Sequence, residues 1–178
     1  MWISQHGFIE KILKRFKLDS CRAVSTPQTL SPLPLPATSD QDDVNNPKVP
    51  YRAIVGCLQY LVQSTRPELV NAVRTLGKLL SKYMLENYVM AKRVLCYLRG
   101  TIDYGLVWRK VESPKLRFVA NADADIGNEK DDRYSITGYV LQLNEWTSAY
   151  TSRKQRIVTD DTCCAEFVAA SECSTMII

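Results

Sequence analysis

The sequence of 178 residues predicts an α+β protein, with helices up to Gly100 and an antiparallel sheet followed by a helix after that point. Up to Gly100, apolar residues recur every three or four positions, which is typical of helices with one buried face. From Tyr104 onward they recur at every second position, as in half-buried strands. The apolar content of 46% is ordinary for a globular protein with a buried core.

The first region is predicted to hold four helices and a long connection. Pro67 suits the first turn of a helix, and glycine at position 100 is a common stop. The stretch 25–49 is rich in proline and acidic residues, and it reads as a linker or an exposed loop. The helices are expected near 6–17, from Tyr51 to Val62, from Pro67 to Leu80, and from about Glu86 to Gly100.

The second region is predicted to be a set of strands closed by one helix. The charged run from Glu129 to Arg133 is expected to be a turn, and Asp160, Asp161 or Thr162 is expected to cap the final helix. Because the chain ends on apolar residues without a helix-stop signal, we expect it to be part of a longer protein. The strands are expected at 104–110, 115–123, 134–143 and 147–153.

Several classes of site are disfavoured by composition. The chain has six cysteines but no Cys-x-x-Cys pair, and His6 is its one histidine, so a structural zinc site is not expected. The single histidine also leaves little room for Ser-His or Cys-His catalysis. There is no signal-peptide core and no run of 18 apolar residues, so we expect an intracellular protein, cytoplasmic or nuclear, with reduced thiols.

Basic residues are concentrated on two predicted helices, within 9–22 and 74–99. The net charge of +4 is too small to indicate by itself what kind of partner the protein binds. Two basic helices fit a polyanion such as nucleic acid, although solvated helix faces are the simpler interpretation. The candidate nucleic-acid-binding residues are Lys78, Lys82, Lys92, Arg93 and Arg99.

Two carboxylates are the candidate catalytic and metal-binding residues. Asp123 lies near the end of the strand 115–123, and Glu166 lies early in an otherwise apolar helix. Carboxylates are costly to desolvate, and a divalent cation between them would remove that cost. The alternatives are a turn-forming aspartate and a glutamate favoured by the helix dipole. A capping box is excluded because Cys163 stands where Ser or Thr would be needed.

Several runs of residues occur together in one order along nearly the whole chain. They include Thr65-Arg-Pro67, Asn121-Ala-Asp-Ala-Asp125 and Ser152-Arg-Lys-Gln155. The sequence resembles the downstream part of a copia-type retrotransposon Pol polyprotein, from the end of reverse transcriptase into the start of ribonuclease H. The other runs that carry the resemblance are 3–16, 24–27, 49–56, 91–101, 132–139 and 165–166.

The resemblance implies an order of four segments. An amphipathic helix following the reverse-transcriptase palm would occupy 1–24, and the linker would occupy 25–49. A helical thumb-like or connection-like region would occupy 50–103. The N-terminal part of a ribonuclease H-like domain, an incomplete hairpin sheet plus helix, would occupy 104–178.

The resemblance also implies a chemistry. Asp123 and Glu166 match metal-binding positions of ribonuclease H, which uses two Mg²⁺ ions to hydrolyse the RNA strand of an RNA–DNA hybrid. The expected partners are the hybrid and the remaining polyprotein segments, with no membrane. Further ligands would lie beyond Ile178, so the chain alone is expected to be inactive.

The chain departs from the family pattern at three positions. Ala122 and Ile126 replace the usual Ser and Trp, and Cys164 stands where the first of two glutamates is usual. These changes favour two alternatives somewhat: a non-catalytic nucleic-acid-binding relic, and a drifted copy with no function.

Overall fold

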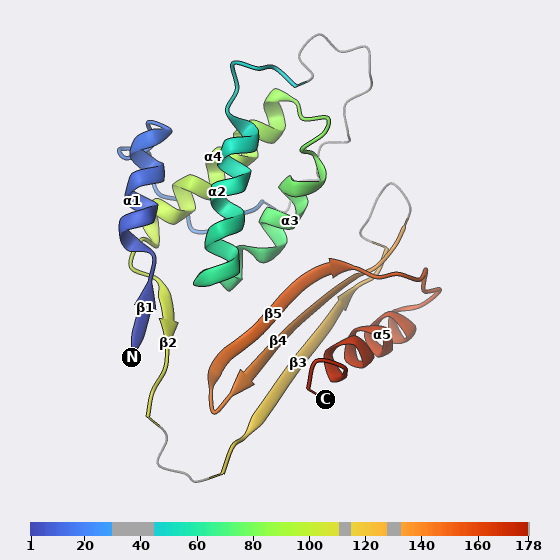
Figure 1. Cartoon of the computed structure of the whole chain (residues 1–178). Coiled ribbons are helices and arrows are strands. Elements are labelled where there is room, and N and C mark those ends of the chain that lie inside the picture. Colours follow the sequence, from blue (N-terminus) through green and yellow to red (C-terminus); the bar gives the residue numbers. More distant parts are fainter. Residues whose placement is uncertain (30–44, 111–114, 128–132, 178) are drawn as a thin grey trace. The chain divides into compact units, whose positions relative to one another are not determined.

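The computed structural model describes residues 1–29, 45–110, 115–127 and 133–177 (Figure 1). In these ranges the protein is α+β, as predicted. The chain forms two compact units. One consists of residues 3–105 and is mostly helical, and the other consists of residues 1–2 and 106–178 and contains a sheet and a helix.

The helical unit packs its first helix together with those that follow the linker. Helix α1 contacts α4, and α2 contacts both α3 and α4. The core contains fully buried aliphatic side chains, such as Leu13, Leu58 and Leu95. Residues from both predicted segments, 1–24 and 50–103, therefore contribute to one hydrophobic core. The elements are α1 (His6–Arg15), α2 (Tyr51–Ser64), the 3-10 helix η1 (Pro67–Leu69), α3 (Val70–Lys78) and α4 (Leu85–Gly100).

One of these helices differs in detail from its predicted form, and another has an additional reason for its terminal glycine. The helix predicted from Pro67 to Leu80 starts as a 3-10 turn with Pro67 in it and ends at Lys78. Helix α4 ends at Gly100, as predicted, but a second reason for glycine is visible there. A Cβ atom at this position would lie 3.0 Å from the Cβ of Ala23, so glycine permits a close approach of the segment that follows α1.

The sheet unit contains an antiparallel three-stranded sheet in the order β3-β4-β5. Its strands are β3 (Phe118–Asp125), β4 (Ile136–Leu143) and β5 (Trp146–Lys154), and α5 (Thr162–Ser174) follows them. The strand predicted at 104–110 is shortened to β2 (Gly105–Val107). It pairs with β1 (Trp2–Ser4), which the sequence did not indicate. Residues 129–132 of the turn predicted from Glu129 to Arg133, and residues 30–44 of the predicted linker, lie outside the described residues.

Helix α5 packs against β3 and β4. Tyr139 and Leu141 of β4 are buried together with Cys173 of α5, and Ala149 of β5 packs against them. The buried side chain of Gln155 adds a polar link, since its Nε2 donates to the carbonyl of Ala165 at 2.9 Å. A small apolar cluster and a buried amide therefore hold the helix on the sheet.

No helix in the described ranges has the length and apolar character that crossing a membrane requires.

Candidate functional site

The two candidate metal ligands lie on neighbouring elements of the sheet unit. Asp123 is exposed on β3, directly opposite Gly138 of β4. Glu166 is half-buried in the first turns of α5, the helix that packs on β3. The fold thus brings the elements that carry these residues next to each other, although they are 43 positions apart in the sequence.

The pleat of β3 nevertheless separates the directions of the side chains. Ala122 lies opposite Tyr139, and Tyr139 packs with Cys173 of α5, so this pair lies on the face toward α5. Because side chains alternate along a strand, Asp123 lies on the other face. The pairing register therefore places Asp123 on the face of the sheet opposite to the one that α5 covers.

The described residues do not by themselves fit a two-cation site. They contain no group of three or more His, Cys, Asp or Glu side chains arranged to hold a metal ion. Mg²⁺ is commonly held by one or two carboxylates and several waters, but the carboxylates must converge on it in near-octahedral geometry, and the face that Asp123 occupies does not favour convergence with Glu166. Whether both carboxylates serve in a longer protein remains a prediction.

The start of α5 is fixed by Asp161, one of the three residues predicted to cap it. Its Oδ1 accepts a hydrogen bond from the backbone N–H of Cys164 at 2.7 Å. The side chain of Cys164 also donates to Oδ2 of Asp161 at 3.5 Å. This hydrogen bond and the nearby negative charge raise the pKa of the exposed Cys164 thiol, which keeps it protonated and a poor nucleophile.

The predicted basic residues fall into two groups in the structure. Lys78 and Lys82 are exposed around the end of α3. Lys92 is half-buried, with its Nζ 4.7 Å from the ring centre of Tyr88. Arg93 donates to Oγ1 of Thr26 at 2.9 Å, and Nε of Arg99 donates to the carbonyl of Asp19 at 2.7 Å. The two arginines thus contact the segment that follows α1, and Lys78 and Lys82 are the two exposed lysines among the five residues.

The same segment brings two thiols together. The Cys21 thiol is hydrogen-bonded to that of Cys96 on α4. Burial, together with this contact, raises the pKa of Cys21 to about 11. Both cysteines are free thiols in this structure.

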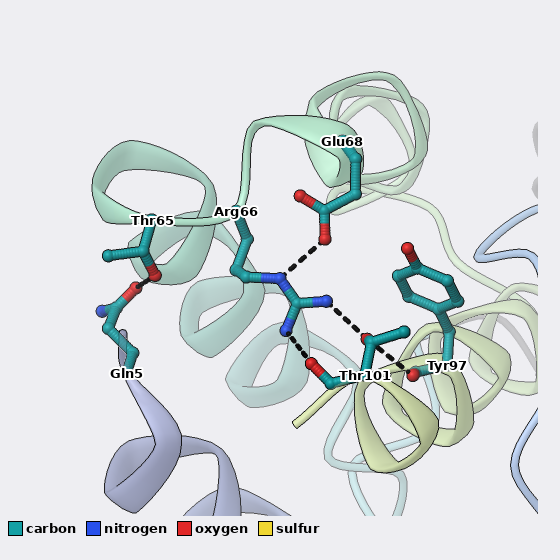
Figure 2. A network of polar contacts seen from close by, with 6 residues as sticks. All are labelled: Gln5, Thr65, Arg66, Glu68, Tyr97 and Thr101. Carbon is teal, nitrogen blue, oxygen red and sulfur yellow. Dashed lines mark hydrogen bonds and ion pairs between the residues drawn. The ribbon is translucent and has the colours of Figure 1, made fainter. Parts of the chain in front are cut away.

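Arg66 is the most deeply buried charged residue in the described part of the chain, and sequence reasoning assigned it no role. Its side chain is 0% exposed. Figure 2 shows that its Nε donates to Oε1 of Glu68 at 2.6 Å. Its two other nitrogens donate to Thr101, one to the carbonyl at 3.1 Å and one to Oγ1 at 2.5 Å. The guanidinium therefore joins the start of η1 to the end of α4.

Aromatic rings and neighbouring polar groups complete this network. The guanidinium carbon lies 5.8 Å from the ring centre of Tyr97 and 5.7 Å from that of Tyr104. In Figure 2, Thr65 donates to Oε1 of Gln5 at 2.7 Å, which connects the chain before α1 to the same junction. The run Thr65-Arg-Pro67 was the one sequence signal for this network, but a single arginine before proline does not indicate burial.

Comparison with known proteins gives long matches to transposon proteins. The chain is 34% identical over 176 residues to the retrovirus-related Pol polyprotein from transposon TNT 1-94 of Nicotiana tabacum. It is 33% identical over 174 residues to the corresponding polyprotein from transposon RE1 of Arabidopsis thaliana. These matches cover 97% of this chain but 13% and 11% of the two polyproteins.

A shorter protein also matches, and here most of its length is covered. The chain is 37% identical over 124 residues to secreted RxLR effector protein 161 of Plasmopara viticola. The matched region covers 70% of this chain and 86% of that protein. No family model matches the chain. No solved structure matches it either. The similarity to the transposon proteins, which extends over nearly the whole of this chain, shows that the chain is homologous to part of the copia-type retrotransposon Pol polyproteins.

Proposed function

We propose that this chain is the part of a Pol polyprotein that joins the end of the reverse transcriptase to the start of a ribonuclease H, and that it helps to hold an RNA–DNA hybrid. The observation that carries the proposal is the match to two Pol polyproteins over 97% of the chain without a change of order. The sequence of elements agrees with it, since a helical unit precedes an antiparallel hairpin sheet and a helix.

The contribution to hybrid binding rests on the exposed lysines of the helical unit. Lys78 and Lys82 are exposed near the end of α3. Contacts from such side chains go to phosphates, so they carry little sequence preference and weaken with added salt. The expected ligand is therefore any RNA–DNA duplex rather than a particular sequence.

Binding of a labelled hybrid across a series of salt concentrations tests this contribution. The double variant Lys78→Gln/Lys82→Gln is expected to weaken binding several-fold and to flatten the dependence on salt. The matched control Lys48→Gln/Lys110→Gln removes the same charge from exposed positions outside both basic stretches. Equal weakening by both pairs would mean that only net charge matters, and that result would contradict the proposed surface.

No catalytic step is assigned to this chain, because the described residues do not complete a metal site. With Mg²⁺ and a labelled hybrid, the chain alone is expected to leave the RNA strand intact. Clear cleavage that disappears in the Glu166→Gln variant would contradict this expectation.

We propose roles for Asp123 and Glu166 only within a longer Pol polypeptide that adds further ligands. In such a polypeptide, Asp123→Asn and Glu166→Gln are each expected to abolish hydrolysis of the RNA strand, because each removes a charged oxygen ligand. Asp125→Asn is the matched control on the same strand, and it should retain activity. If Asp125→Asn abolished hydrolysis while Asp123→Asn and Glu166→Gln retained it, the proposed ligand roles of Asp123 and Glu166 would be wrong.

A non-catalytic nucleic-acid-binding relic is the alternative function. The replacement of three family residues, at Ala122, Ile126 and Cys164, favours it. Under this alternative the longer polypeptide binds hybrid with the same salt dependence but does not cleave it. Absence of any salt-dependent binding would instead indicate a copy that has lost both properties.

A further inference from the structure

The segment that follows α1 lies against the end of α4. Nε of Arg99 donates to the carbonyl of Asp19 at 2.7 Å. One residue further along the helix, a Cβ atom on Gly100 would lie 3.0 Å from the Cβ of Ala23. Two points of this segment, four residues apart, therefore contact the last turn of α4.

Cys21 and Cys96 lie between these contacts. Cys96 is three positions from both Arg93 and Arg99, and residues at this spacing share one face of a helix. Both arginines donate to the segment after α1, so Cys96 lies on the face that this segment covers. Cys21 is two residues from each contact point of the segment. The two thiols are neighbours, and they are hydrogen-bonded to each other.

The backbone around Cys21 is held by a turn at the end of α1. Lys17 has a positive φ of 57°, and the N–H of Leu18 donates to the carbonyl of Leu13 at 2.9 Å, as is common where helices end. The N–H of Cys21 then donates to the carbonyl of Leu18 at 3.2 Å. Local hydrogen bonds therefore position Cys21, in addition to the contacts with α4.

The other thiols of α5 differ from this pair. Cys163 and Cys164 are adjacent on α5, and adjacent positions of a helix do not face each other. Cys173 is buried. Cys21 and Cys96 are both half-buried, so a small oxidant can reach them while a second protein is largely kept away.

We propose that Cys21 and Cys96 form a reversible disulfide, a redox modification site that fastens the segment after α1 to α4. Thiols that are already in contact need little movement to form the bond. The bond joins positions 75 residues apart in the sequence, and closing so long a loop restricts the unfolded chain and stabilises the folded one. It uses contacts within the helical unit alone and is independent of the proposed function.

The oxidant is a small-molecule disulfide such as oxidised glutathione, and the reaction is two successive exchanges. The deprotonated sulfur of Cys96 attacks one sulfur of the oxidant, and the first glutathione thiolate leaves. The deprotonated sulfur of Cys21 then attacks Sγ of Cys96 and expels the second thiolate. Two protein thiols are oxidised to one disulfide, the disulfide of the oxidant is reduced to two thiols, and the two cysteine protons end on those thiols.

Cys21 is the second sulfur to react. Burial and the contact with Cys96 raise its pKa to about 11, so at neutral pH it is protonated and a poor nucleophile. In the mixed disulfide, Cys96 no longer carries the thiol that bonds to Cys21, while the positive charge of Arg99 still favours the Cys21 thiolate. Closure of the disulfide is therefore expected to accelerate as the pH rises from neutral.

Incubation of the whole chain in glutathione buffers of increasingly oxidised composition tests the disulfide. The parent protein is Cys163→Ser/Cys164→Ser, which removes the two exposed thiols of α5. After alkylation of free thiols, mass spectrometry of proteolytic peptides should find a link between Cys21 and Cys96 in oxidising buffers and lose it in reducing ones. Thermal unfolding should give the linked form a Tm about 5 °C or more above that of the reduced form.

Cysteine variants separate this pair from thiol oxidation in general. Cys21→Ser and Cys96→Ser should each abolish both the link and the shift in Tm. Cys57→Ser, at a half-buried thiol of α2, is the matched control and should retain both. Loss of the link in the control as well would contradict a specific pair.

A second set of variants tests whether the docked segment sets the rate. Arg99→Leu removes the contact with Asp19 and the charge near Cys21, so closure should slow several-fold. Arg22→Leu removes the same charge from an exposed position next to Cys21 and should leave the rate unchanged. If both variants slow closure equally, the contact between Arg99 and the segment does not position the thiols.

Three results would overturn the proposal. One is a pair of thiols that stays reduced in the most oxidising buffer. Another is mixed disulfides with glutathione that accumulate at both positions without a link. The third is a link that persists in fully reducing buffer, because such a bond would be a permanent structural disulfide rather than a reversible modification.

Discussion

The helical unit and the sheet unit differ in how completely they bury their own apolar surface. In the helical unit, leucines such as Leu58 and Leu95 are 0% exposed, and even an arginine is enclosed with its hydrogen bonds satisfied. In the sheet unit, the apolar cluster consists of Tyr139, Leu141 and Cys173, with Ala149 packed against it. Phe167 on the outer side of α5 is 76% exposed. Helices that pack on several neighbours form a core by themselves, whereas a three-stranded sheet with one helix leaves an edge and a face uncovered.

The largest expected effect is a cavity in the helical core. Leu58→Ala should lower the free energy of unfolding by about 3 to 5 kcal/mol, because a fully enclosed site cannot collapse around the missing atoms. Leu141→Ala in the sheet unit should cost about 2 kcal/mol, since its small cluster can relax. Urea titrations followed by far-UV circular dichroism measure the loss of unfolding free energy in both variants. Leu85→Ala, at a position that is 57% exposed, is the control. Equal costs at positions 58 and 141 would remove the contrast between the units.

The next effect comes from the buried guanidinium. Arg66→Lys keeps the charge but cannot donate to Glu68 and Thr101 at the same time, and it should cost about 2 to 3 kcal/mol. The same urea titration measures the loss, with the exposed Arg22→Lys as its matched control. If the two substitutions have the same small effect, the network in Figure 2 does not stabilise the junction between η1 and α4.

A smaller effect is expected at the start of α5. Asp161→Ala removes the cap on the N–H of Cys164 and should cost about 1 kcal/mol. Faster amide exchange at Cys164 is the local readout. Asp160→Ala changes a neighbouring exposed carboxylate that is not the cap residue, and its exchange rates should match those of the unmodified chain. Comparable acceleration in both variants would argue against a specific capping role.

The smallest effect is a dependence on pH in the helical unit. The pKa of Cys21 is raised from 9.0 to about 11 in the folded chain, so the folded state holds this proton more tightly than the unfolded state does. Its contribution to stability is complete below pH 9 and is lost as the pH rises toward 11. Unfolding titrations should show a steeper decline over this range for the unmodified chain than for Cys21→Ala. An identical decline of stability with pH in the two proteins would contradict a raised pKa of Cys21 in the folded chain.

Sequence periodicity anticipated most of the elements because each depends on local spacing. The helical stripe from Tyr51 to Val62 lies within α2, and the period-two stretch 134–143 contains β4. Strand β1 was not anticipated because it has three residues, too few to show a period, and it is defined by pairing with β2. Asp161 was anticipated as one of three caps, but only the backbone geometry selects it.

The sequence by itself determined the α+β class and the change from helices to strands near residue 104, because these follow from the spacing of apolar residues. Its homology to Pol polyproteins came from similarity to known sequences rather than from spacing. Tertiary structure decided which charges are buried, which are exposed and which face each residue occupies. Arg66 is enclosed by residues 97–104, which are far away in the sequence. Asp123 and Glu166 lie on adjacent elements but on different sides of a strand, because the pairing register and the helix position set the face.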